Sequence, residues 1–300
     1  MKVLVTGGAG FIGSNLIKFL NEKDVKVTVL EDFDRMHWQN LADLEFEDLI
    51  DKDKAEDIIY YRKYDCVVHL GAITDTSCTN FKLLYENNYK FTTKLIESCS
   101  VSAIPVIYAS SAAVYGIEGY PINEYGFSKL LIDNYVRRFN TSHSIPIIGL
   151  RFFNVYGPRE GHKGDMASII YQKYHEITNQ GKATLFRPKG VPFQRDFVYV
   201  DDVVKVIWYF ITHPKSGIYD VGTGIPRTFE YVVDLIFQTL KLETNIKYKY
   251  MPICLKNRYQ PFTMAKLEAL RDAGYEDEFT QVYVGVKKYV EWLKERSVEI

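Results

Sequence analysis

The chain has 300 residues, a formal net charge of −1 and 47% hydrophobic residues, which allows one large domain or two smaller ones. The near-neutral charge, without long basic or acidic blocks, gives no reason to expect nucleic acid or a membrane as partner. No apolar run approaches the roughly 18 residues of a transmembrane helix, and the first residues favour a strand over a signal peptide. Four cysteines and six histidines are scattered, so we predict no metal site, no disulfide framework and a cytoplasmic protein.

A glycine-rich turn near the N-terminus indicates a dinucleotide site. Residues 2–6 read as an apolar strand, and Gly7, Gly10 and Gly13 follow at G-x-x-G-x-x-G spacing before an amphipathic helix. These glycines permit a tight turn, close approach of a pyrophosphate and close packing of the helix on the strand. The helix N-terminus then presents N–H groups to the phosphates.

Apolar strands alternate with helices through the first half of the chain. Further strands are predicted at 26–30, 66–70, 106–109 and 145–150, and helices at 83–100 and 124–140. Continuous apolar strands separated by helices indicate a parallel sheet covered on both faces. We therefore predict a Rossmann-type, doubly wound α/β fold, with ligands at the carboxyl ends of the strands.

The second half of the chain predicts a smaller, mostly helical substrate-binding lobe. Asp201 or Asp202 is the expected cap of a helix that ends near His213. The expected strands are 197–200 and 217–221, and the other expected helices are 165–180, 228–240, 263–272 and 282–295. The predicted domains are 1–157 with 195–222 for the dinucleotide, and 158–194 with 223–300 for the substrate.

Tyr125 and Lys129 form a Y-x-x-x-K motif, about one helical turn apart on a shared face. A tyrosine has a pKa near 10, so a base working near neutral pH needs that pKa lowered by roughly 2–3 units. The ammonium of Lys129 is expected to lower it, and the hydroxyl of Ser111 to bind the same reacting oxygen. The motif alone is common on helix surfaces, but its order after the glycine turn and SSAAVYG (110–116) favours a catalytic role.

This order of motifs resembles the extended short-chain dehydrogenase/reductase family, whose members bind NAD or NADP and mostly remodel nucleotide-activated sugars. The resemblance covers the whole chain. Segments typical of ADP-glyceromanno-heptose 6-epimerases are RFFNVYGPREGHKGDMAS (151–168), QRDFVYVDDV (194–203), GIYDVGTG (217–224) and LKNRYQPFT (255–263). EGHKG-x-MAS and RYQ-x-FT are the more specific patterns.

The resemblance implies a homo-oligomeric enzyme that inverts C6 of ADP-D-glycero-β-D-manno-heptose, giving the L-glycero sugar of the lipopolysaccharide inner core. Tyr125 and Lys163 are the implied acid/base pair, Ser111 polarises the reacting oxygen, and Lys129 holds the nicotinamide ribose. The implied substrate contacts are Asn154, Asp165, Gln172, Phe186, Arg195 and Tyr259. The implied cofactor contacts are Gly7, Gly10, Phe11, Ile12, Gly13, Glu31, Asp32, His37, Lys52, Leu70, Gly71, Ala72, Ile73, Thr74, Asn87, Tyr125, Lys129 and Val155.

The chemistry at C6 explains why two bases are plausible. C6 bears an alcohol without an adjacent carbonyl, so its hydrogen leaves as a hydride and returns to the other face of a ketone. The C6 hydroxyl proton then has a different position in the two isomers. Tyr125 is expected to exchange it in one isomer and Lys163 in the other. Each such proton transfer is worth roughly 10²–10⁴ in rate.

The cofactor predicted from the resemblance is NADP, with NAD as the alternative. Glu31 and Asp32 end a strand where a carboxylate usually meets the ribose diol of NAD. The heptose epimerases use NADP and place lysines near its 2′-phosphate. One of those positions is Lys52 and the other falls on His37, with Arg35 close by. A phosphate beside Glu31 is costly unless these cations offset the repulsion.

Alternative functions stay open at this level. Asp165 stands where the heptose epimerases typically have a serine, and residues 116–121 are shorter than usual, so a GDP-heptose or a UDP-hexose is an alternative substrate. Dehydratases carry an acidic pair after the serine, whereas Ala112 and Ala113 follow Ser111 here. Regulators that have lost the chemistry usually lack the tyrosine or the lysine, and this chain keeps both.

Overall fold

The computed structural model describes residues 1–55, 57, 59, 63–139, 145–188, 190–252 and 259–297. Among these residues, no helix has the length and apolar character needed to cross a membrane. Residues 255–258 of the LKNRYQPFT segment, Cys254, and Asn140 at the end of a predicted helix lie outside this set.

Seven parallel strands form the central sheet in the order β11-β6-β5-β4-β1-β2-β3. Val3, Leu4 and Val5 of β1 have no exposed surface, as expected for a strand covered on both faces. This sheet confirms the predicted Rossmann-type fold and adds β3, which the sequence analysis did not predict. The bounds are β1 (Lys2–Thr6), β2 (Lys26–Glu31), β3 (Asp48–Asp51), β4 (Cys66–His69), β5 (Val106–Ser111), β6 (Ile147–Phe152) and β11 (Gly217–Val221).

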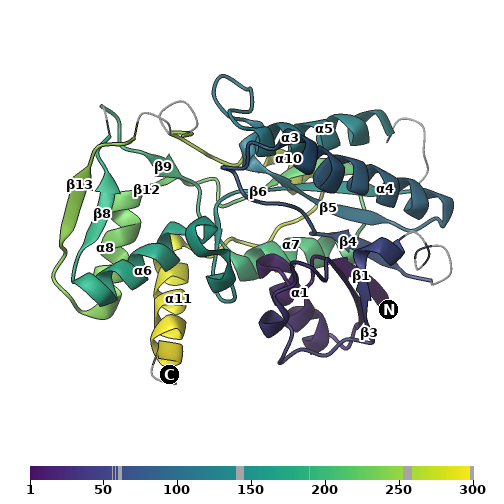
Figure 1. Ribbon diagram of the computed structural model, residues 1–300, viewed down its shortest axis with the longest axis horizontal. Helices are drawn as coiled ribbons and strands as arrows, with labels where there is room; N and C mark the ends of the chain where they lie inside the picture. The colour runs from purple at the N-terminus through teal and green to yellow at the C-terminus, as the bar shows by residue number, and fades with distance from the viewer. Residues whose placement is uncertain are drawn as a thin grey trace.

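Helices cover both faces of the sheet (Figure 1). On one face, α1 (Phe11–Glu22) and α7 (Val200–Thr212) pack against each other and share an apolar cluster with the strands. On the other face lie α3 (Phe81–Leu84), α4 (Phe91–Val101) and α5 (Glu124–Phe139). The apolar side chains of α4 and α5 form a second cluster with the sheet.

A second lobe lies to the left of the sheet in Figure 1 and contains the C-terminus. Its apolar cluster joins three helices and a parallel strand pair. These are α6 (Ile169–Gln180), α8 (Phe229–Leu240), α11 (Val282–Ser297), β8 (Ala183–Phe186) and β13 (Ile246–Lys249). The remaining short elements are η1 (Trp38–Asn40), η2 (Lys52–Lys54), η4 (Ala112–Val114), η5 (Gly161–Met166), β7 (Val155–Tyr156), β9 (Gln194–Arg195), β10 (Val198–Tyr199), β12 (Arg227–Thr228) and α10 (Glu268–Asp272).

The predicted single helix over 83–100 is interrupted. A π-helical segment, η3 (Tyr85–Lys90), separates α3 from α4. A π turn inserts about one residue relative to α-helical phase and is frequent at functional sites. The interruption therefore changes which side chains of this helix face the sheet.

Two other helix starts were predicted wrongly. The N-cap of α7 is Tyr199 rather than Asp201 or Asp202. Asp202 instead accepts hydrogen bonds from the backbone nitrogen (2.7 Å) and hydroxyl (3.0 Å) of Thr280. The predicted helix 165–180 begins only at Ile169, after the side chain of Ser168 caps it.

The predicted helix 263–272 is helical only over α10 (Glu268–Asp272). The residues before it have no regular secondary structure, and two of their backbone N–H groups bind distant carboxylates. Ala265 donates to Asp196 at 3.0 Å, and Lys266 donates to Asp220 at 3.0 Å. These bonds replace the hydrogen bonds of a helix.

Candidate active site

A cavity of about 1130 Å³ lies along the carboxyl ends of β1, β4, β5 and β6 and extends to the second lobe. Every residue that the sequence analysis assigned to catalysis, cofactor or substrate lines it. The tertiary structure thus gathers these residues in one place, while their individual roles stay predictions. Among the described residues, no group of three His, Cys, Asp or Glu side chains is arranged to hold a metal.

The glycine turn shapes one end of the cavity. Gly7 has a φ of +68°, and a Cβ atom there would lie 2.5 Å from the backbone nitrogen of Gly71. Gly10 is the N-cap of α1, and among the described residues no side chain caps this helix start. The first turn of α1 lines the cavity beside Leu70, so the structure provides the cradle that a pyrophosphate requires.

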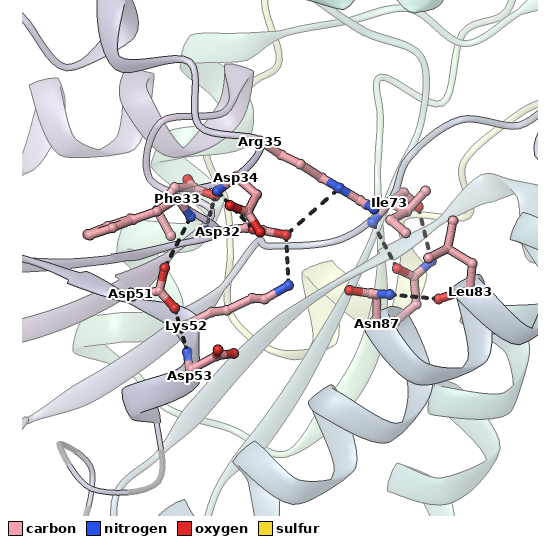
Figure 2. A network of polar contacts seen from close by, with 12 residues as sticks. Asp32, Phe33, Asp34, Arg35, Asp51, Lys52, Asp53, Ile73, Leu83 and Asn87 are labelled. Atoms are coloured by element: carbon pink, nitrogen blue, oxygen red, sulfur yellow. Dashed lines mark hydrogen bonds and ion pairs between the residues drawn. The ribbon is translucent and has the colours of Figure 1, made fainter.

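At the expected ribose end, acidic and basic side chains are already paired (Figure 2). The Nζ atom of Lys52 lies 2.8 Å from Oδ2 of Asp32, and Nε of Arg35 lies 4.0 Å from the same oxygen. The Glu31 carboxylate accepts hydrogen bonds from the backbone nitrogens of Ala9 (2.9 Å) and Asp32 (3.1 Å). Burial raises the pKa of Glu31, although these two bonds oppose the shift. Two carboxylates and two cations therefore surround the place where we expect the ribose 2′ position, at which NAD and NADP differ.

The π-helical segment η3 carries an unpredicted residue, Asn88, which is buried and binds a residue of the cavity wall, whereas its neighbour Asn87 lines the cavity itself. Its Oδ1 accepts from the backbone nitrogen of Ile73 (2.8 Å), and its Nδ2 donates to the Ile73 carbonyl (3.0 Å) and to Oγ of Ser128 (3.1 Å). Asn87, which the sequence analysis favoured, donates to Leu83 of its own helix at 2.9 Å (Figure 2). Asn88 thus connects the cofactor-side loop to the helix that carries Tyr125.

The three predicted catalytic residues of the sheet edge lie together. Ser111 ends β5 and lies near Tyr125, which α5 presents. Burial raises the pKa of Tyr125, and the neighbouring Ser111 hydroxyl lowers it by less. The expected lowering by Lys129 is not seen. Its Nζ donates to the carbonyl of Ala109 at 2.8 Å and lies 6.0 Å from the centre of the Tyr125 ring.

A buried ionic network that the sequence analysis missed lies behind Lys129. Asp133, one turn further along α5, pairs with Nε of Arg151 at 2.8 Å. It also accepts a hydrogen bond from Tyr108 at 3.0 Å. Burial lowers the pKa of Lys129 to about 8, and the Asp133 carboxylate opposes this shift. The sequence pattern that could have indicated this network is the spacing of Lys129 and Asp133, which are four residues apart on one helix.

Lys163 lies in η5, on a loop that reaches the first turn of α1. Its ammonium is 5.4 Å from the ring centre of Phe11. Burial lowers the pKa of Lys163, and the Glu160 carboxylate raises it. The ring centre of the predicted cofactor residue His37 lies 4.3 Å from that of His162 of this loop, with the two ring planes tilted by 40°. A solvated surface lysine would show neither the burial nor these neighbours.

Arg195 lies at the other end of the cavity among aromatic rings and is 8% exposed. Its guanidinium carbon is 5.1 Å from the ring centre of Tyr259 and 5.6 Å from that of Phe229. Tyr259 in turn contacts Phe193 and Phe186, with ring centres 5.0 Å and 6.1 Å away. Arg195 makes no salt bridge within the described part of the chain, so this end of the cavity is suited to an anion.

The other predicted substrate contacts use part of their polar atoms within the protein. Nδ2 of Asn154 donates to the Asp196 carbonyl at 2.9 Å. Nε2 of Gln172 donates to the carbonyls of Asp165 (2.9 Å) and Ala167 (2.8 Å), which fixes the Lys163 loop. The Asp165 residue is exposed at the cavity edge.

The short segment 116–121 forms a tight hairpin beside the cavity. Ile117 and Tyr120 form its bridge, and Nε2 of the cavity residue Gln260 donates to the carbonyl of Gly116 at 3.1 Å. The hairpin is thereby tied to the same segment as Tyr259. Its length consequently affects the position of a cavity wall.

A family model described as the NAD dependent epimerase/dehydratase family matches residues 3–222. The chain belongs to this family. The match spans the whole parallel sheet together with the segments carrying Ser111, Tyr125, Lys129 and Lys163. The protein is therefore a member of the nucleotide-sugar epimerases and dehydratases, with a site for a nicotinamide cofactor.

Solved structures of three epimerases are similar over almost the whole chain. ADP-L-glycero-D-manno-heptose-6-epimerase of Helicobacter pylori is 30% identical, with a TM-score of 0.84 over 98% of this chain and 96% of that one. UDP-N-acetylglucosamine 4-epimerase of Methanobrevibacter ruminantium is 25% identical, with a TM-score of 0.87 over 98% of each chain. UDP-glucose 4-epimerase of Thermotoga maritima, at 23% identity and a TM-score of 0.87 over 99% of each chain, shares the fold.

Proposed function

We propose that this protein converts ADP-D-glycero-β-D-manno-heptose to ADP-L-glycero-β-D-manno-heptose by epimerisation at C6, in lipopolysaccharide inner-core heptose biosynthesis. The observation that carries the proposal is the position of Lys163. The EGHKG loop brings a half-buried lysine to the cavity that contains Tyr125. The 30% identity to the heptose 6-epimerase of Helicobacter pylori over nearly the whole chain supports the same substrate.

The residues present fit a nicotinamide dinucleotide. The turn at Gly7 and the start of α1 would hold its pyrophosphate, and Lys129 would hold the nicotinamide ribose. The bound cofactor supplies the hydride acceptor and donor for C6. The site residues of the chain supply proton transfer, orientation and exclusion of water.

Tyr125 and Lys163 move the proton of the C6 hydroxyl. In one isomer Tyr125 takes this proton while Ser111 hydrogen-bonds the same oxygen. In the other isomer the hydroxyl sits differently, and Lys163 returns the proton. Burial lowers the pKa of Lys163, which makes its ammonium a stronger acid than that of an exposed lysine.

We propose that Arg195 binds the diphosphate and that Tyr259 and Phe186 flank the nucleotide part of the substrate. A buried guanidinium forms paired, charge-assisted hydrogen bonds with phosphate oxygens. Residues 1–157 with 195–222 then serve the cofactor, and residues 158–194 with 223–300 serve the nucleotide sugar.

The cofactor that we propose is NADP. Lys52 and Arg35 flank Asp32 at the ribose end, and both cations are within reach of a 2′-phosphate once Asp32 releases them. NAD is the alternative, favoured by the Glu31 carboxylate at the end of β2.

We also propose that the enzyme is a cytoplasmic homo-oligomer. Tyr85 and Phe127 are 37% and 44% exposed on neighbouring helices. Their ring centres lie 6.2 Å and 5.5 Å from that of Phe81. Such an exposed aromatic row suits a subunit interface, and light scattering of the purified protein measures the oligomeric state.

The test of the reaction is incubation of the purified protein with ADP-D-glycero-β-D-manno-heptose without added cofactor, followed by proton NMR of C6. Growth of the L-glycero isomer is the expected result. No conversion, with cofactor bound to the protein, would reject this substrate. A parallel incubation with UDP-N-acetylglucosamine tests the 4-epimerase alternative, which the similarity to the enzyme of Methanobrevibacter ruminantium favours.

A further inference from the structure

Glu160 is a carboxylate without exposed surface, three residues before Lys163. It accepts three hydrogen bonds. They come from the backbone nitrogen of Ser168 (2.5 Å), the hydroxyl of Ser168 (2.7 Å) and the backbone nitrogen of Gly157 (3.3 Å). Burial of an ionised carboxylate is costly unless it is well bonded or paired with a charge, so this position needs an explanation.

The three donors lie at the two ends of the loop that carries Lys163. Gly157 begins this loop, and Ser168 ends it as the N-cap of α6. In addition, the backbone nitrogen of Lys163 donates to the Glu160 carbonyl at 3.0 Å. The Glu160 side chain therefore ties the two ends of this loop together, and its backbone carbonyl holds the turn before Lys163.

Charged and titratable groups from three sides surround this pair. Lys163 is the cation that interacts with the Glu160 carboxylate, and Tyr289 of α11 is the titratable group facing that carboxylate from the second lobe. On the other side of Lys163 lies His162, which burial keeps at a pKa of about 4 and therefore neutral. Burial raises the pKa of Glu160, and the bonds from Ser168 and the charge of Lys163 oppose this shift, so Glu160 is the carboxyl group that acts on Lys163.

We infer that Glu160 is a positioning residue for Lys163, fixing the loop from within and keeping the lysine charged until it transfers a proton. This inference rests on the proposed acid/base role of Lys163 for its consequence in catalysis. The effect of Glu160 on the Lys163 amine is independent of which sugar is the substrate.

The test is competitive labelling of amines in the purified enzyme with trace acetic anhydride across a range of pH, with each lysine read separately by peptide mass spectrometry. Glu160→Gln keeps the shape and most hydrogen bonds but removes the charge. We expect its Lys163 labelling midpoint to fall by about one pH unit. The matched control is Glu176→Gln, which removes the carboxylate 2.6 Å from Lys173 on α6 and should leave the labelling midpoint of Lys163 unchanged.

An unchanged Lys163 midpoint in folded Glu160→Gln would overturn the inference. If Glu160→Gln does not fold, Ser168→Ala is the deciding variant. It keeps the Glu160 carboxylate and removes the hydroxyl that donates a hydrogen bond to it. A looser loop should then raise the Lys163 midpoint toward that of an ordinary lysine, and no change would overturn the inference. Failure of the heptose assay with shifted labelling would reject the proposed function and leave this inference standing.

Discussion

The guanidinium of Arg195 lies over the ring of Tyr259, with 5.1 Å between its central carbon and the ring centre. Burial lowers the pKa of Arg195, and the residue makes no salt bridge within the described residues. A desolvated cation without a counter-ion destabilises a folded protein unless a ligand supplies the negative charge. This is why we propose that an anionic substrate group binds at this end of the cavity.

Arg195→Met should weaken the binding of the nucleotide sugar without lowering the stability of the protein. We expect the KM for the nucleotide sugar to rise roughly 10- to 100-fold, because a charge-assisted hydrogen bond to phosphate is lost. The thermal unfolding midpoint should stay equal or rise, because the desolvation cost of the guanidinium disappears. Arg187→Met is the control, since Arg187 also lies over a tyrosine, at 5.8 Å from the Tyr250 ring centre, but outside the cavity. An unchanged KM in Arg195→Met would exclude diphosphate binding by this residue.

Lys52→Ala should distinguish the two cofactors. The variant loses the cation 2.8 Å from Asp32, so we expect about tenfold weaker NADP binding and little change for NAD. Titration of the cofactor-free enzyme with each dinucleotide, followed by tryptophan fluorescence, measures both affinities. Lys54→Ala, on an exposed residue of η2, is the control. Equal losses for NAD and NADP would show that Lys52 does not contact a 2′-phosphate.

Tyr125→Phe and Lys163→Met should each reduce turnover by roughly 10²–10⁴ without loss of the fold. Tyr125 lines the cavity and Lys163 lies on a loop that other side chains fix, so we expect the fold to survive both substitutions. Turnover by NMR together with the circular dichroism spectrum checks both statements. Tyr120→Phe, at a tyrosine that is 74% exposed, should keep full activity. A wild-type rate in either active-site variant would remove that residue from the mechanism.

The stability contribution of Lys129 should depend on pH in a defined direction. Burial lowers its pKa from 10.5 to about 8 in the folded state. Between these values the unfolded chain binds more protons, so the free energy of unfolding rises with pH, by at most about 3 kcal/mol. Below pH 8 both states are protonated and the folded state bears the full cost of the buried charge.

Chemical denaturation of the wild type and Lys129→Met from pH 7 to pH 10 measures this effect. The stability of the wild type relative to the variant should increase as the pH rises through the window above 8. The loss of the hydrogen bond to Ala109 is common to all pH values and does not alter the trend. A difference that is constant with pH would mean that Lys129 is not a desolvated cation.

Asn88→Leu should destabilise the protein by roughly 2–4 kcal/mol, because the backbone N–H and C=O of Ile73 lose their partners in a buried site. Cofactor binding should weaken too, since Ile73 lines the cavity. In Asn87→Ala the lost bond is to Leu83 of the same helix, so we expect a loss below about 1 kcal/mol. Urea denaturation of both variants compares them. Equal destabilisation would contradict the assignment of Asn88 as the connecting residue.

The sequence predicted most of the sheet and the location of the site. Continuous apolar runs such as Val3–Val5 are typical of buried parallel strands. Tyr125 and Lys129 share a helical face because they are four residues apart. The sequence did not predict β3, the π-helical interruption between α3 and α4, or the irregular stretch before α10. In the last case the backbone N–H of Ala265 is bound by Asp196, a residue far away in the chain.

Local patterns therefore determined the glycine turn, the order of strands and helices, and the residues that reach one cavity, because backbone conformation depends on near neighbours. Only the tertiary structure decided which asparagine of the pair at 87 and 88 points inward, since one π turn shifts the helical phase. It also decided that Asp32 binds Lys52, that Arg195 lacks a carboxylate partner among the described residues, and that Glu160 is buried beside Lys163. Partners of charged side chains are set by packing between distant segments, and spacing along a single chain does not encode them.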